Sequence, residues 1–179
     1  MSGIDEFAGL LLEEAKRFLE RASGASTEEG RTAFSHAALM LAFCALEAHV
    51  NATADEFASR PELSIHERAV LLEQQVRFDF GEFKAGGLRM VSLQDRMLFL
   101  HLKFGGKALD RSASWWADLS DAVTLRNNLT HPKEAPVIEV EHVRRAIVAI
   151  ITGINVLFRA VYRRPFPVAN LGLDARLRF

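Results

Sequence analysis

The stretch LRNNLTHPK, residues 125–133, gathers polar side chains in what reads as the last turns of a helix, just before Pro132. An arginine can hold a phosphate through a rigid, planar fork of N–H groups. A histidine can take up or release a proton near neutral pH, which suits a general acid or base. Arg126 and His131 stand five positions apart and have the side chains to clamp a phosphate and to move a proton.

Arg126 lies within the apolar stripe of its predicted helix. At 100° per residue it falls close to Leu119, Ala122 and Val123 and not on the polar side. An arginine in such a place is costly unless it is paired or unless the stripe lines a cleft. A structural ion pair and a functional cation are both open interpretations at this point.

Glu47 is a natural partner for this arginine. It is the only charged residue between Arg31 and Asp55, and it lies in the apolar arc of another predicted helix. Asn51 follows one turn later on the same face. We predict a buried or half-buried Glu47–Arg126 ion pair that fixes the direction of the guanidinium.

His131 is expected to lie at the end of its helix. Because Pro132 follows, the backbone at His131 is biased away from the α region, and its side chain would project past the other helices. One exposed histidine at a helix end usually has no special role. Its nearness to Arg126 favours a function.

The segment RNNLTH resembles the motif of the HEPN superfamily (higher eukaryotes and prokaryotes nucleotide-binding domains), in which an arginine and a polar residue precede a histidine. Arg126, Asn127 and His131 match these three positions, and Glu47 matches an acidic residue that an earlier helix of the family often supplies. The resemblance extends in scattered pieces over residues 34–158.

This resemblance implies an all-α fold, namely an up-and-down four-helix bundle with one or two additional helices, which commonly forms a homodimer. Many HEPN domains are metal-independent endoribonucleases, often toxins or defence effectors. Arg126 would then be the phosphate clamp, His131 the base and Asn127 an orienting group. Glu47, Asn51 and Thr130 would support the site, and neither a metal nor another cofactor is expected.

Three functions are compatible with the sequence. The first is an endoribonuclease that cleaves RNA through attack of the 2′-hydroxyl. The alternative is a non-catalytic binding and dimerisation module that partners a nucleotidyltransferase, an antitoxin or another toxin-system protein. The third is helical packing with a structural ion pair only. The presence of both Arg126 and His131 favours the first, and a homodimer would bring two motifs around one cleft and bury Trp115 or Trp116.

The elements that must position these residues are predicted to be helical almost throughout. Capping signals occur at Ser26 with Glu29, at Ser64 with Glu67, and at Ser92 with Asp95. The predicted helices cover about 5–22, 26–58, 64–75, 92–105, 112–131 and 139–163. Residues 77–91 alternate and are rich in Phe and Gly, which predicts an irregular loop or a short hairpin. We expect one domain over 1–164 and an irregular tail over 165–179.

Composition places the chain among ordinary globular proteins. It has 179 residues, a net charge of −1 and a single cysteine, Cys44, whose apolar neighbours predict a buried thiol. The start of the chain has no signal-peptide pattern, and the longest uncharged runs, Thr32–Leu46 and Ala146–Phe158, are shorter than the roughly 20 residues of a membrane span. We therefore expect a cytoplasmic protein without a membrane partner. The six histidines are scattered, so no metal site is predicted.

Overall fold

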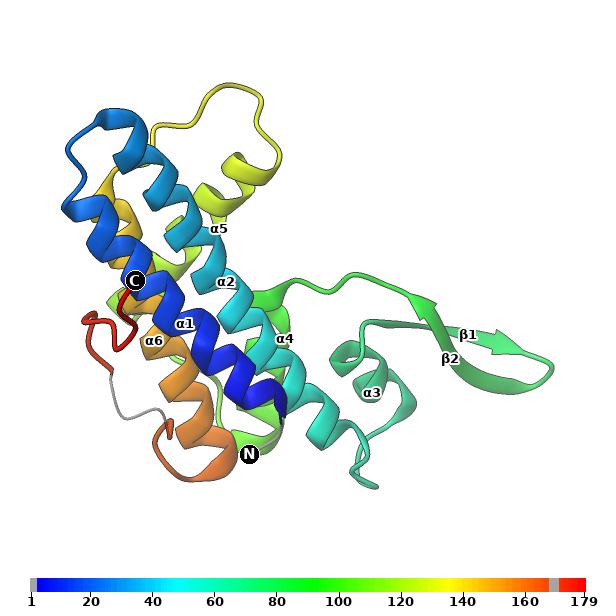
Figure 1. The fold of residues 1–179 in the computed structure, drawn as a ribbon. Helices are drawn as coiled ribbons and strands as arrows, with labels where there is room; N and C mark the ends of the chain where they lie inside the picture. Colours follow the sequence, from blue (N-terminus) through cyan, green and yellow to red (C-terminus); the bar gives the residue numbers. More distant parts are fainter. Residues whose placement is uncertain (1–2, 168–170) are drawn as a thin grey trace.

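The computed structural model describes residues 3–167 and 171–179, which form a mostly helical protein with one small sheet (Figure 1). Figure 1 shows the helices packed side by side and the two strands standing away from them. The prediction of a helical fold is confirmed in this coarse form. The elements are, in chain order, α1 (Gly3–Ser23), α2 (Glu28–Ala58), α3 (Ile65–Leu71), β1 (Gln74–Asp79), β2 (Glu82–Leu88), α4 (Leu93–Gly105), α5 (Ser114–Thr130) and α6 (Val140–Tyr162).

Helices α2 and α6 form the centre of the molecule. α2 packs against each of the other five helices, and α6 packs against α1, α2, α4 and α5. Small residues on α2 such as Ala38, Ala42 and Ala45 are fully buried, which lets neighbouring helices approach closely. A helix covered on several sides has apolar residues around most of its circumference, and this explains why α2 is the most apolar stretch of the sequence.

Two of the predicted helix starts are confirmed. Ser64 caps α3 in a capping box, accepting a hydrogen bond from the backbone N–H of Glu67 while the Glu67 carboxylate accepts one from the backbone N–H of Ser64. The Ser92 hydroxyl likewise accepts from the backbone N–H of Asp95 and caps α4. The predicted end of α4 is also confirmed, because Gly106 takes the left-handed conformation (φ 76°) that glycine adopts without strain.

Two predicted boundaries are wrong. The cap of α2 is Thr27 and not Ser26, because the Thr27 hydroxyl accepts the backbone N–H of Gly30. Both residues are hydroxyl caps, so the sequence pattern does not separate them. α3 ends at Leu71 rather than near Gln75, because Glu73 turns the chain with a positive φ of 52°.

The segment predicted as a loop or short hairpin is an antiparallel hairpin that begins three residues earlier than expected. Its two-residue turn consists of Phe80 (φ 47°) and Gly81 (φ 87°). Positive φ at both central residues is what a type I′ turn requires. In Figure 1 this hairpin projects away from the helices, and its contacts with them are with α3.

Both tryptophans pack within the protein. Trp116 is buried in the main core, and half-buried Trp115 lies against Gly153 of α6. The expectation that one of them is exposed and waits for a dimer partner is therefore wrong. The prediction for Cys44 is also wrong, because this thiol is exposed on α2.

Helices α2 and α6 are longer than the uncharged runs of the sequence indicated, and by length and composition either could span a bilayer. About half of the most apolar stretch of each, 50% and 56%, is buried inside the protein. Core helices of soluble proteins have the same properties.

The described part of the predicted tail, beyond α6, has no helix or strand, and residues 168–170 of that tail lie outside the described residues. Residues 171–179 lie along α1. Arg17 donates a hydrogen bond to the backbone oxygen of Phe179 at 2.8 Å, and the Phe179 ring meets that of Phe18 with centroids 5.7 Å apart.

The contact between Gly153 and Trp115 gives a stability prediction. A Cβ atom at Gly153 would lie 3.2 Å from Cζ3 of Trp115 and 3.3 Å from Cε of Met97. Gly153→Leu should therefore lower the free energy of unfolding by about 1–3 kcal/mol in a urea titration, although leucine is the better helix former. Val148→Leu, at an exposed position of the same helix, should change it by less than about 0.5 kcal/mol. Equal effects of the two changes would show that α5 and α6 are not closely packed here.

Candidate functional site

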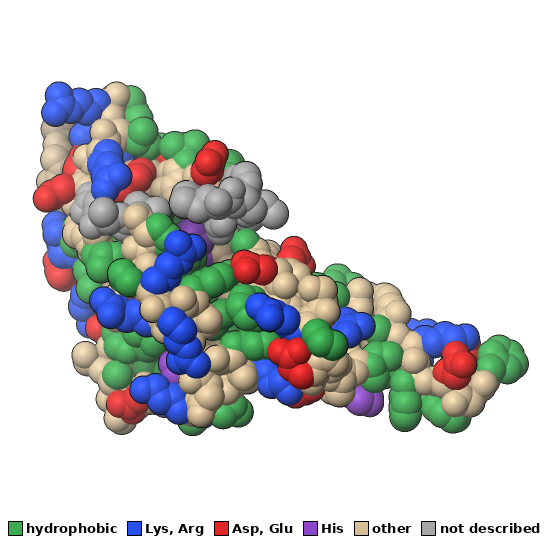
Figure 2. Space-filling view, turned by 90° about the horizontal axis from the view of Figure 1, so that it is seen from below, with side chains coloured by type: hydrophobic (Ala, Val, Ile, Leu, Met, Phe, Trp, Pro, Cys, Tyr) green, Lys and Arg blue, Asp and Glu red, His purple; other side chains and the backbone are tan. Residues whose placement is uncertain are grey.

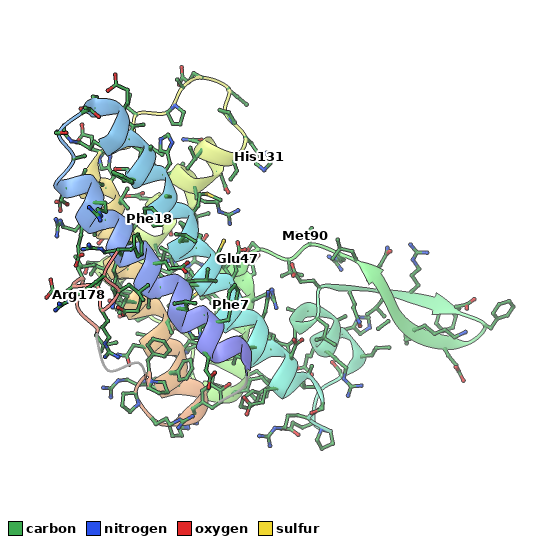
Figure 3. The ribbon with its side chains drawn as sticks, viewed as in Figure 1. Phe7, Phe18, Glu47, Met90, His131 and Arg178 are labelled. Carbon is green, nitrogen blue, oxygen red and sulfur yellow. The ribbon has the colours of Figure 1, made fainter. Side chains whose placement is uncertain are left out.

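An open cavity of about 350 Å³ lies beside α2, α4 and α5, at the root of the hairpin. This volume is within the range of small-ligand sites. Figure 3 shows Glu47 on α2 and Met90 on the segment that leads from the hairpin into α4. The cavity is lined by Glu47, Asn51, Glu73, Met90, Val91, Ser92, Leu93, Gln94, Arg96, Val123, Arg126 and Asn127.

Helix α2 presents a polar stripe, defined as Cys44, Glu47, Asn51 and Asp55, of which Glu47 and Asn51 line the cavity. Three of these residues are exposed and Glu47 is half-buried, whereas their neighbours on either side are mostly buried. Spacings of three and four residues place them on one face of the helix. Partial desolvation of the thiol, followed by the nearby Glu47 carboxylate, raises the pKa of Cys44, which is the opposite of the shift that activates a cysteine as a nucleophile.

The predicted ion pair between Glu47 and Arg126 is confirmed. Nη2 of Arg126 donates to Oε1 of Glu47 at 3.1 Å, and the guanidinium lies 5.1 Å from the ring centroid of Phe43. The Glu47 side chain is 45% exposed and the Arg126 side chain 24% exposed, so the pair is half-buried. Nη2 donates to Glu47 only, and Nη1 makes no hydrogen bond within the described residues, so the partly exposed end of the guanidinium keeps N–H groups that a ligand could use. Nε is buried and has no hydrogen-bond partner among the described residues, so it is out of a ligand's reach.

A second arginine, Arg96 of α4, is held much more tightly. Its Nη1 donates to Oδ1 of Asn51 at 2.7 Å and to Oε2 of Glu73 at 3.2 Å, and its Nη2 donates to the backbone oxygen of Leu71 at 2.9 Å. Burial lowers the pKa of this guanidinium, and the carboxylates of Glu73, Asp55 and Glu47 oppose that shift. An arginine remains charged despite such a shift, so Arg96 is a buried cation with its acceptors already in place.

Glu73 connects this arginine to the hairpin. One of its carboxylate oxygens accepts from Arg96, and the other accepts from the backbone N–H of Val91 at 3.2 Å. Its backbone oxygen accepts from the backbone N–H of Arg89 at 2.8 Å. A glutamate with positive φ is strained, and such strain persists only where the surroundings impose it. Glu73 thus ties both ends of the hairpin to the cavity wall.

Sequence reasoning missed Arg96 and Glu73, although a signal for Arg96 was present. It stands one turn after Leu93 and one turn before Leu100 in an apolar stripe, which is the pattern that drew attention to Arg126. Glu73 carried no comparable signal, because it lies in a turn and its role depends on the path of the hairpin.

The predicted site residues are only partly brought together. Asn51 and Asn127 line the cavity beside Arg126, but the partner of Asn51 is Arg96. The Thr130 hydroxyl donates to the backbone oxygen of Arg126 at 3.1 Å and is exposed at the helix end, away from the cavity lining. His131 is the C-cap of α5, exposed as predicted, and it does not line the cavity. In the view of Figure 3, His131 at the end of α5 is clearly separated from Glu47 on α2.

Within residues 3–167 and 171–179, no three His, Cys, Asp or Glu side chains are grouped so that they could hold a metal ion. Comparison with models of protein families, with curated proteins and with solved structures gives no match.

The unequal burial of the two arginines leads to a prediction. Arg96→Ala leaves the Glu73 carboxylate, the Asn51 amide and a backbone oxygen without their donor, and we expect a loss of about 3 kcal/mol in the free energy of unfolding. Glu47→Ala removes a half-exposed partner and should cost less than about 1 kcal/mol. Denaturant titrations of both variants measure these values.

Arg96→Lys is the informative control, because an ammonium cannot present the planar fork that reaches three acceptors. We expect it to recover little of the loss. A loss for Glu47→Ala as large as that for Arg96→Ala would contradict the assignment of Arg96 as the buried structural cation.

Proposed function

We propose that this protein is a metal-independent endoribonuclease of the HEPN type, in which Arg126 binds the scissile phosphate and His131 acts as the base. The observation that carries the proposal is the state of Arg126. It lies in the wall of an open cavity, points along a single hydrogen bond to Glu47, and retains N–H groups not used by the described residues. A phosphodiester is an acceptor that such a fork recognises well.

The chemistry would proceed by internal attack. His131 takes the proton of the ribose 2′-hydroxyl, and the 2′-oxygen forms a bond to phosphorus. The bond from phosphorus to the 5′-oxygen of the next nucleotide breaks, and that oxygen receives a proton from solvent water. The products are a 2′,3′-cyclic phosphate and a 5′-hydroxyl. Arg126 stabilises the negative charge that develops on the phosphate oxygens, and Asn127 beside it offers a further polar contact.

The electrostatics of the cavity define the role of Glu47. The lining holds two arginines and two glutamates, so their charges balance. Both Nη atoms of the buried Arg96 already donate to acceptors of the protein, namely Asn51, Glu73 and the backbone oxygen of Leu71. The half-exposed Glu47 is the carboxylate that must share Arg126 with an incoming phosphate. Glu47 therefore serves to orient the guanidinium and is not proposed as a proton carrier.

A HEPN-type four-helix bundle and a toxin or defence role belong to the same proposal. The dominance of helices and the place of Arg126 near the end of one of them support the bundle. RNA is then the expected substrate, and an antitoxin is an expected partner.

A second function is favoured by a different observation. His131 does not line the cavity that contains Arg126, and five residues of helix separate the two by a rise of roughly 7.5 Å. A cavity without the base suits a non-catalytic module that binds a partner such as a nucleotidyltransferase. The two functions differ in whether His131 is needed for a chemical step.

RNA cleavage in the presence of a strong chelator tests the proposal. The wild-type protein should cut single-stranded RNA and leave 2′,3′-cyclic phosphate ends. Arg126→Ala and His131→Ala should each reduce the rate by about 10²–10⁴-fold, since each removes a group that acts in the transition state. The ends are identified by mass spectrometry and the rates by gel analysis.

Two matched variants serve as controls. His66→Ala removes another exposed histidine, and Arg31→Ala removes another arginine that pairs with a glutamate, at 2.9 Å, on an exposed surface. Both should cut RNA at the wild-type rate. If His131→Ala also cuts at that rate, or if the chelator abolishes cleavage, the mechanism is wrong. If the wild type does not cut RNA at all, the binding module becomes the better explanation.

A further inference from the structure

The β1–β2 hairpin exposes more apolar surface than its size explains. Phe78, Phe80 and Phe83 are 66%, 96% and 56% exposed, and Leu88 and Met90 at its exit are exposed as well. Figure 2 shows the hairpin as the narrow projection of the molecule, with hydrophobic and charged side chains next to each other at its end. An isolated two-stranded hairpin is marginally stable in water, so this one is a good candidate for a partner surface.

The pairing of the strands separates the side chains onto two faces. Phe78 lies opposite Phe83, and their rings meet with centroids 5.2 Å apart on one face. The other face carries two cross-strand pairs of like charge, Arg77 opposite Lys84 and Asp79 opposite Glu82. Like charges directly opposite each other destabilise a hairpin, and the described structure relieves them with one diagonal bridge, Lys84 to Asp79 at 3.0 Å.

The outer edge of β1 carries no strand within the described residues. In a hairpin with a two-residue turn, the closing pair exchanges hydrogen bonds and the next pair does not. The backbone N–H and C=O of Phe78 therefore point outward, away from β2. β1 contains no glycine, whereas β2 contains Gly86 and Gly87, the latter with φ 72°, so β1 offers the more regular edge.

We propose that the hairpins of two copies of this chain join along their β1 edges, antiparallel, around a two-fold axis at Phe78. Arg77 of each copy then lies opposite Asp79 of the other, and the like-charge pairs of each hairpin meet pairs of the opposite sign. On the opposite face the four rings of Phe78 and Phe83 form one continuous row. The edge hydrogen bonds that Phe78 leaves open are satisfied by Phe78 of the second copy.

Charge selects this register over its neighbours. Because the outward backbone groups alternate along β1, the nearest permitted shifts move the two-fold axis to Arg77 or to Asp79. The first places two arginines opposite each other, and the second places two aspartates opposite each other. The register centred on Phe78 is the one that makes every charge on this part of β1 face its opposite.

This contact goes beyond the proposed ribonuclease. It uses the outer half of the hairpin and no residue of the cavity or of α5, so its test is independent of RNA cleavage. It is a different contact from the homodimer expected from the sequence, in which two motifs surround one cleft.

Charge exchange between Arg77 and Asp79 tests the proposal by analytical ultracentrifugation of the full chain. The wild type should be a dimer at micromolar concentration. Arg77→Asp alone and Asp79→Arg alone should each raise the dissociation constant at least about tenfold, because two opposite-charge contacts become like-charge contacts. The double variant Arg77→Asp/Asp79→Arg should return to the wild-type value, and so should an equimolar mixture of the two single variants.

Unfolding of the hairpin cannot imitate this pattern. Arg77→Asp turns the pair of Arg77 with Lys84 into an opposite-charge pair and should not weaken the hairpin. Asp79→Arg does the same with Glu82 but gives up the Lys84–Asp79 bridge, so recovery in the mixture of the two single variants is the result that loss of the hairpin cannot produce. A monomeric wild type overturns the proposal, as does a dimer that the single changes leave intact. A monomer whose exposed Phe78 and Phe83 bind a single-stranded oligonucleotide would assign this face to nucleic acid instead and would likewise overturn it.

Discussion

The buried guanidinium of Arg96 is the interaction on which the arrangement around the cavity depends. It joins four segments that are distant in sequence, namely α4 itself, Asn51 of α2, the end of α3 at Leu71, and Glu73 at the root of the hairpin. A cation removed from water requires acceptors in fixed places, so each of these segments is held in one position relative to the others. The wall of the cavity and the direction in which the hairpin leaves the helices both follow from that requirement.

The two arginines of the cavity have different parts because their surroundings differ. Arg96 is buried and its acceptors are the protein's own, so its contribution is to structure. Arg126 is partly exposed, has one carboxylate partner, and rests on the ring of Phe43. A cation held in direction but not saturated is the kind that can exchange a neighbouring carboxylate for a phosphate. This contrast explains why the proposed chemistry is assigned to Arg126, although Arg96 is the more strongly bound of the two.

Sequence patterns predicted the helices, most of their ends and the Glu47–Arg126 pair, because these depend on local capping signals and on helical periodicity. They did not predict the Arg96 cluster, whose acceptors are brought together by the turn at Glu73 and the path of the hairpin. They also misjudged Cys44. Its neighbours in sequence are apolar, but the face of α2 on which it lies is open to solvent. Composition around a residue predicts burial poorly on a helix that is covered on most sides and open on one.

That open side of α2 has a consequence for how the protein can change over evolutionary time. Most of the helix is enclosed by its neighbours, so replacements there are restricted by volume and polarity. The polar stripe of Cys44, Glu47, Asn51 and Asp55 is less restricted by volume, although Asn51 accepts a hydrogen bond from the buried Arg96. Two of its members, Glu47 and Asn51, line the cavity. Half of the positions in this stripe are therefore positions that the proposed site would hold constant. Homologous sequences that keep the fold but not the proposed activity should diverge along this stripe, and first at Glu47, because Asn51 is also held by Arg96.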